Sequence, residues 1–153
     1  MACPFFMPVE KLENGTWPHP SRLPLGAGWS GHCTAPGHQG EAPSPEELHR
    51  FCNLGYADRC PRLPQGRVSD AVRFAVTRAR NPGDKDGAQS LIQLRYVCER
   101  AHLPVDNGFL IFNSVARQWQ EAHSDHRIQR MAECFLQSYV EKMKRQEEAR
   151  AAS

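Results

Sequence analysis

Four cysteines in the first sixty residues are the side chains whose type and spacing indicate chemistry. Cys3, Cys33, Cys52 and Cys60 follow one another with 29, 18 and 7 residues between them. Four thiolates are the ligand set of a tetrahedral Zn²⁺ site or a [4Fe–4S] cluster. The segment that carries them is rich in proline and glycine, so regular structure does little to fix its path. We therefore expect these four cysteines to bind one metal centre that orders the segment.

The two remaining cysteines lie in regular apolar patterns. Cys98 belongs to a segment that alternates like a strand, and Cys134 lies beside the apolar stripe of a helical segment. A reduced cysteine in such a position usually packs as a small hydrophobic side chain. We therefore place both outside the ligand set.

The spacing favours an iron–sulfur cluster over zinc. Structural zinc sites are usually built from C-x2–4-C knuckles, and the sequence contains none. A cuboidal cluster accepts thiolates from well-separated directions, and Cys60-Pro61 resembles the Cys-Pro that closes ferredoxin-type cysteine runs. The predicted cofactor is a [4Fe–4S] cluster, with Zn as the alternative and a metal-free set of cysteines as the third reading.

Three histidines lie near these cysteines in the sequence. His32 directly precedes Cys33, His38 follows it, and His49 lies one helical turn before Cys52. Any of them could replace a thiolate, which would favour zinc or a Rieske-type iron centre. A lone loop histidine is more often solvated or hydrogen-bonded, so we expect all three beside the metal ligands and not among them.

The elements that must position the cysteines change in character near Gly66. Ten of the twelve prolines and eight of the eleven glycines lie at or before this residue. This density predicts a wrapped loop over residues 1–43, with no long helix or central strand. Ser44-Pro45-Glu46-Glu47 predicts the start of a helix with a capping box, and the inner face of that helix carries Cys52.

Beyond residue 66 the pattern predicts a sheet and a helix. Apolar residues alternate over 72–77 and 92–99, which is typical of two antiparallel strands, with a polar connector at 81–87 between them. Asp106-Asn107-Gly108 predicts a turn before a third strand at 109–112. Ser124-Asp125 predicts the cap of a final helix.

The predicted fold class is therefore α+β. A small antiparallel β-sheet is backed by a C-terminal α-helix, over residues 67–153. Residues 1–66 form a loop-rich, cysteine-ligated metal region with one short helix, and both parts belong to one compact domain.

Composition restricts the classes of function. The net charge of the 153 residues is +2, which is too small to indicate a nucleic-acid partner, although a local basic patch would change that. The chain has no apolar run long enough to span a membrane and no signal-peptide pattern, so a cytoplasmic location with reduced cysteines is expected. It also lacks phosphate-binding, dinucleotide-binding and hydrolase motifs, which argues against an enzyme.

The resulting expectation is a small iron–sulfur protein that serves as an electron carrier or accessory subunit and contacts a protein partner. The alternative is a zinc-stabilised protein-interaction module without a redox role. An enzyme that uses one of the cysteines is the third hypothesis. One feature lies outside these readings, a series of arginines beside the cysteine loop that suits a solvated face, an acidic partner or phosphate: Arg59, Arg62, Arg67, Arg73, Arg78 and Arg80.

Overall fold

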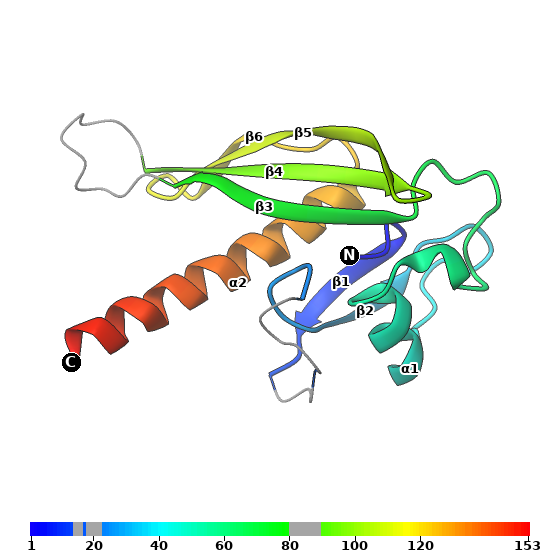
Figure 1. Ribbon diagram of the computed structural model, residues 1–153, viewed down its shortest axis with the longest axis horizontal. Helices are drawn as coiled ribbons and strands as arrows, with labels where there is room; N and C mark the ends of the chain where they lie inside the picture. Colours follow the sequence, from blue (N-terminus) through cyan, green and yellow to red (C-terminus); the bar gives the residue numbers. More distant parts are fainter. Residues whose placement is uncertain (14–16, 18–22, 80–89) are drawn as a thin grey trace.

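We describe a computed structural model of the chain (Figure 1), in which residues 1–13, 17, 23–79 and 90–153 are described. The predicted connector at 81–87 lies outside these residues. The described elements form two antiparallel sheets and a long C-terminal helix, which confirms the α+β class.

The N-terminal part contains a two-stranded sheet of β1 (Phe6–Lys11) and β2 (Trp29–Cys33). It is followed by a short helix α1 (Pro45–Glu47), a π-helical turn (Leu48–Cys52) and a 3₁₀ turn (Ala57–Arg59). The predicted helix start is confirmed, because the Ser44 and Glu47 side chains form the reciprocal hydrogen bonds of a capping box.

The C-terminal part is a four-stranded antiparallel meander followed by a helix. Its strands lie in the order β3 (Ala71–Ala79), β4 (Leu91–Arg100), β5 (Leu103–Asn113) and β6 (Gln118–Glu121). Helix α2 (His126–Ala151) begins at the predicted cap Asp125, whose side chain accepts a hydrogen bond from the backbone of Arg127.

Helix α2 covers one face of the larger sheet (Figure 1). Leu94 and Leu110 are directly opposite each other on β4 and β5 and pack with Leu136 of α2. Trp119 of β6 meets Phe112 edge-on, with ring centroids 5.2 Å apart, so its ring has an apolar partner on β5. The last turns of α2 are exposed and extend beyond the sheet.

A second core joins the N-terminal segment to the sheet. Ala2 exchanges two backbone hydrogen bonds with Val72 of β3, of 2.9 and 2.8 Å. Both residues are fully buried in a cluster that also contains Phe6 and Trp29. The beginning of the chain is therefore fixed against the edge of the larger sheet.

Residues 1–43 were predicted to be a wrapped loop without a long helix or central strand, and the structure adds two short strands there, which are both edges of a two-stranded sheet. Pro8 lies in β1 at a register shift, where a strand tolerates the missing N–H. Gly31, opposite Pro8, is required because a Cβ there would lie only 2.1 Å from the Met7 carbonyl oxygen. The breakers therefore mark the irregular points of a paired strand.

The predicted turn at Asp106-Asn107-Gly108 is also wrong, because these residues lie inside β5. The chain reverses earlier, at Ala101 and His102, which both have positive φ. Tertiary contacts hold this reversal: the Tyr56 hydroxyl accepts a hydrogen bond from the N–H of His102, and the two rings stack.

Candidate metal centre

One small pocket is lined by all four cysteines of the predicted ligand set. Cys3 precedes β1, Cys33 ends β2, Cys52 ends the π-helical turn, and Cys60 follows the 3₁₀ turn. The four thiols also interact electrostatically with one another. Segments separated by up to 57 positions in the sequence thus meet at one place.

Backbone hydrogen bonds tie these segments together. The N–H of Cys3 donates to the carbonyl of Cys52 at 3.1 Å, and the N–H of Thr34 donates to the carbonyl of Phe5 at 2.8 Å. The buried Asn53 side chain accepts from the N–H of Trp29 and donates to its carbonyl, at 3.0 and 2.9 Å. Asn53 was not identified from the sequence, since nothing in the neighbouring residues shows its pairing with β2.

Cys3 and Cys60 begin turns of the same design. The N–H of Phe6 donates to the carbonyl of Cys3, and the N–H of Leu63 donates to the carbonyl of Cys60, both at 3.1 Å. A proline follows each cysteine and supplies the φ angle that the second position of a β-turn requires. The two Cys-Pro dipeptides therefore favour the turn conformation that follows each cysteine.

In three of the four cysteines, the backbone N–H two residues later is directed at the sulfur. Ala35 donates to Cys33 Sγ at 3.5 Å, and the N–H groups of Phe5 and Arg62 do the same for Cys3 and Cys60. A thiolate is a better acceptor than a neutral thiol, because hydrogen bonds to ionised groups are roughly twice as strong. The loops thus carry donors for thiolates.

Burial has the opposite effect on the thiols. It raises the pKa of Cys3 to about 12 and also raises the pKa of Cys52 and Cys60. The neighbouring sulfurs raise these pKa values further, while the N–H groups at Cys3 and Cys60 lower them. Without a bound metal ion, the pocket therefore favours neutral thiols. Thiolates in it require the positive charge of a metal centre to compensate for their burial.

Cys98 and Cys134 differ from the other cysteines in position and in hydrogen bonding. Both are buried, at 4% and 1% exposure, and lie in the apolar core away from the pocket lining. Burial raises the pKa of each to about 11, and no backbone N–H opposes this shift. They pack as hydrophobic side chains.

The rest of the pocket lining is mainly apolar. Phe5, Phe6, Phe51 and Leu63 contribute rings and an aliphatic side chain that exclude water. Cys3 and Cys52 are buried, at 6% and 8% exposure, whereas Cys33 and Cys60 are partly exposed. The pocket thus has a dry inner side and a solvent-facing edge.

Arg62 is the only cation among the described residues that line this pocket. Its guanidinium contacts the carboxylates of Glu47 and Glu41, each at 3.1 Å, and its side chain is 19% exposed. It also interacts electrostatically with Cys33 and Cys60. Arg62 therefore joins the helix start to the loop after β2 beside the more exposed thiols.

As the side chains lie, no group of three or more His, Cys, Asp or Glu in the described part of the chain is arranged to hold a metal ion. The four thiols therefore line one pocket without converging on a single ion position. The cavity between them measures about 20 Å³, which has room for about one water molecule. A cuboidal cluster would require the four loops to move apart.

The three histidines lie outside the pocket lining. His38 pairs with Glu41 at 3.0 Å, and this glutamate also contacts Arg62. His49 stacks on Trp17, with ring centroids 4.0 Å apart, and His32 lies in β2.

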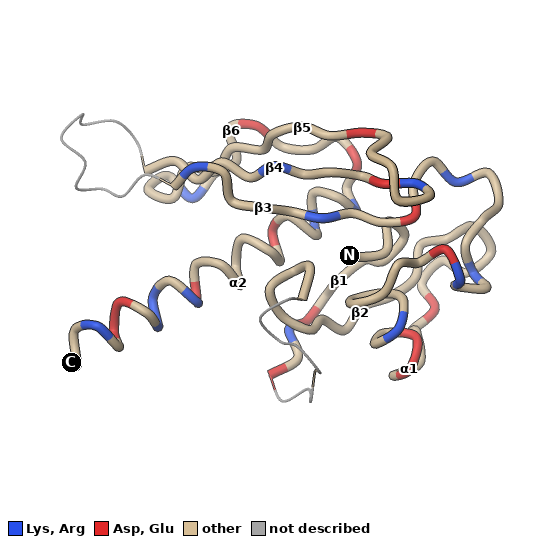
Figure 2. The backbone as a smooth tube through the Cα atoms, in the orientation of Figure 1, with Lys and Arg blue, Asp and Glu red and all other residues tan. Residues whose placement is uncertain are grey.

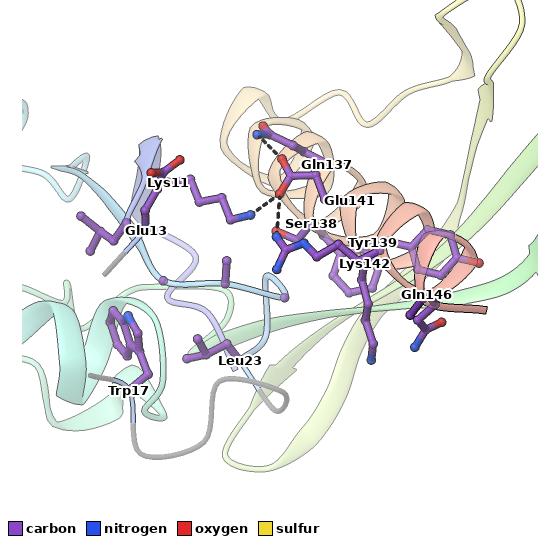
Figure 3. A pocket seen from close by; sticks show the side chains of 17 residues that line it. Lys11, Glu13, Trp17, Leu23, Gln137, Ser138, Tyr139, Glu141, Lys142 and Gln146 are labelled. Atoms are coloured by element: carbon purple, nitrogen blue, oxygen red, sulfur yellow. Dashed lines mark hydrogen bonds and ion pairs between the residues drawn. The ribbon is translucent and has the colours of Figure 1, made fainter. Parts of the chain in front are cut away.

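A larger groove of about 990 Å³ lies between α2 and the segment after β1 (Figure 3). It is crossed by an ion pair between Lys11 and Glu141, which also accepts a hydrogen bond from Gln137. Among the described residues, its lining contains neither cysteine nor histidine. We assign no chemistry to it.

Within the described residues, no helix combines the length and apolar character that crossing a membrane would require. Comparison with known proteins found no family model, no curated protein and no solved structure that matches the chain.

Proposed function

We propose that the protein binds a [4Fe–4S] cluster through Cys3, Cys33, Cys52 and Cys60 and acts as an electron carrier or as an accessory subunit in electron transfer. The observation that carries this proposal is the pocket lined by four thiols, three of which receive a backbone N–H two residues on. Hydrogen bonds to sulfur stabilise cluster thiolates and influence the reduction potential.

The sequence is the reason to propose a cluster before a single ion. Structural zinc sites are usually built from C-x2–4-C knuckles, and the chain contains none. Ligands that come from four separate segments suit a larger group, whose irons lie apart from one another. Either metal would require the side chains to move, because no group of three in the described residues is arranged around one ion.

Electron transfer is the chemistry that such a centre would supply. Four cysteine ligands saturate a [4Fe–4S] cluster, so no coordination position is left for a substrate. The apolar lining limits the access of water, while the partly exposed Cys33 and Cys60 provide an edge for electron exchange with a protein partner. A cytoplasmic location, where thiols stay reduced, belongs to this proposal.

A zinc-stabilised interaction module is the second candidate, and the small cavity favours it. A space of about 20 Å³ is closer to the size of one ion than to that of a cluster. In this case small side-chain rotations would bring the four sulfurs to one Zn²⁺, and the metal would only stabilise the fold.

Anaerobic purification and reconstitution distinguish these cases. The cluster proposal predicts brown protein with about four iron and four sulfide per chain, and a broad absorbance that reduction bleaches. Colourless protein with one zinc per chain would replace it with the second candidate. Folded protein that takes up neither metal would refute both.

A further inference from the structure

The outer face of the larger sheet is open. Side chains alternate along each strand, so Leu94 and Leu110 face α2 while Arg95 and Phe109 face the opposite way. No described element lies over this second face (Figure 1). Arg73 is 57% exposed and Phe109 is 49% exposed.

Three cross-strand rows define this face. Its middle row is Ala75, Arg95 and Phe109, which are directly opposite one another on β3, β4 and β5. On one side of it lies the row Arg73, Val97 and Asn107, again given from β3 to β5. On the other side lies the row Arg78, Gln93 and Ile111. Arg95 therefore lies at the centre of the three rows, with the half-exposed ring of Phe109 directly opposite it on β5. Arg73 and Arg78 lie on β3, in the rows on either side of Arg95.

The arginine series of the sequence does not form one surface. Arg62 and Arg67 pair with Glu47 and Asp70. Arg59 lies in the 3₁₀ turn, and Arg80 lies outside the described residues. Figure 2 shows basic positions along β3 and β4. By strand register, Arg73, Arg78 and Arg95 belong to the outer sheet face.

The cations of the face are largely free. Arg78 and Arg95 have no ion-pair partner within the described ranges, and Arg73 contacts only the buried carboxylate of Glu99 at 2.9 Å. The other acidic residue of the face, among those described, is Glu121 on the edge strand β6. The centre of the face is therefore positively charged despite the small net charge of the chain.

We propose that this face binds single-stranded nucleic acid, with a base stacked on Phe109 and phosphates held by Arg73, Arg78 and Arg95. Aromatic side chains bind unpaired bases in a sequence-tolerant way, and arginines beside them hold the backbone. A second copy of the chain is disfavoured, because it would bring arginines against arginines. An acidic protein would pair with the arginines and leave the Phe109 ring without a stacking partner.

This proposal does not depend on the identity of the metal centre. The test is fluorescence anisotropy of a labelled 15-nucleotide oligothymidylate with the full chain, in about 50 mM salt. Phe109→Ala should weaken binding about 5- to 150-fold, the range measured for loss of one stacked base. Phe109→Tyr keeps a ring and should stay within about threefold of the unsubstituted protein.

Arginine variants test the charge contribution separately. Arg95→Gln should reduce the dependence of log affinity on log salt by about 0.7, the value for one phosphate contact on a single strand. Arg145→Gln is the control, since this arginine is 73% exposed on α2, away from the sheet face.

Three outcomes would overturn the proposal. The first is absence of binding at about 100 μM protein in low salt. The second is equal binding of the oligonucleotide by Phe109→Ala and by the unsubstituted chain, when melting curves show that both proteins are equally folded. The third is binding of inorganic polyphosphate or anionic lipid vesicles with no binding of the oligonucleotide.

Discussion

Serine substitution at Cys52, compared with the same substitution at Cys98, separates a metal ligand from a core cysteine. The two side chains form a matched pair, because they are 8% and 4% exposed and belong to the same hydrophobic cluster. Only Cys52 lines the thiol pocket. Any difference in metal content between the two variants therefore reflects the pocket and not burial.

The expected cost of each substitution follows from this burial. A buried hydroxyl without a hydrogen-bond partner costs about 1–3 kcal/mol. For a chain of this size, each 1 kcal/mol lowers the melting temperature by about 2–4 °C. Without metal, both variants should therefore melt about 2–12 °C below the unsubstituted protein.

With metal, the two variants should separate. A ligand present at 1,000 times its dissociation constant stabilises the native state by about 4 kcal/mol. Cys98→Ser should keep this contribution, and Cys52→Ser should lose it. Iron and sulfide analysis, visible absorbance and melting curves with and without anaerobic reconstitution provide the measurements. A full complement of four iron in Cys52→Ser, or loss of iron in Cys98→Ser, would show that the assignment of ligands is wrong.

Three other predictions follow from the pocket and its supports. Arg62→Gln removes the positive charge beside Cys33 and Cys60, so the reduction potential of a bound cluster should fall by on the order of tens of millivolts. Spectroelectrochemistry measures this potential, and an unchanged value would contradict the electrostatic role of Arg62. If Cys3 is a metal ligand, chymotrypsin should cleave at Phe5 and Phe6 more slowly with metal than after chelation, because metal binding would stabilise this segment further. Equal rates would exclude Cys3 as a ligand. Burial alone would raise the pKa of Asp70, but hydrogen bonds from the Ala101 N–H and from Arg67 lower it overall. The carboxylate therefore contributes stability above its unfolded pKa of about 3.9 and loses it as the pH falls through the lower native value. Asp70→Asn should destabilise by about 2 kcal/mol at pH 7 in urea titrations, and the difference from the unsubstituted protein should shrink as the pH falls below about 3.9.

The elements predicted correctly are those specified by neighbouring residues. The capping box at Ser44 and the cap at Asp125 depend on side chains within three positions. The alternation around Val72 and Leu94 is likewise local, and both residues are fully buried in strands. Local hydrogen bonding and periodicity suffice for these elements.

The elements that were missed depend on contacts between distant residues. Strand β1 forms despite Pro8 because β2 pairs with it from more than twenty positions away. The reversal at Ala101 and His102 contains neither glycine nor asparagine, and it is held by Tyr56 and Asp70 from other segments. Turn propensity alone placed the reversal too late, at the Asp-Asn-Gly sequence that the structure includes in β5.

The candidate site divides in the same way. Context alone separated the four loop cysteines from Cys98 and Cys134, and the structure places only the four along one pocket. For Cys3 and Cys60, the N–H donors two residues later have a sequence signal in the Cys-Pro dipeptides that start β-turns, whereas Cys33 is followed by Thr34. No sequence signal predicted the hydrogen bonds of Asn53 or the ion pairs of Arg62 with two carboxylates, because these interactions join separate segments.

The pocket and the open sheet face are joined by one short backbone connection. Strand β3 is an edge strand, and an edge without a partner is prone to open or to pair with another chain. Ala2 covers the start of this edge through its two hydrogen bonds to Val72. Ala2 directly precedes Cys3, and Val72 directly precedes Arg73, so this bridge connects the two residues. If a metal binds at Cys3, the free energy of binding would therefore also stabilise the β3 edge and the position of Arg73. Because linkage is reciprocal, a ligand that orders the sheet face would strengthen metal binding at the pocket by the same factor.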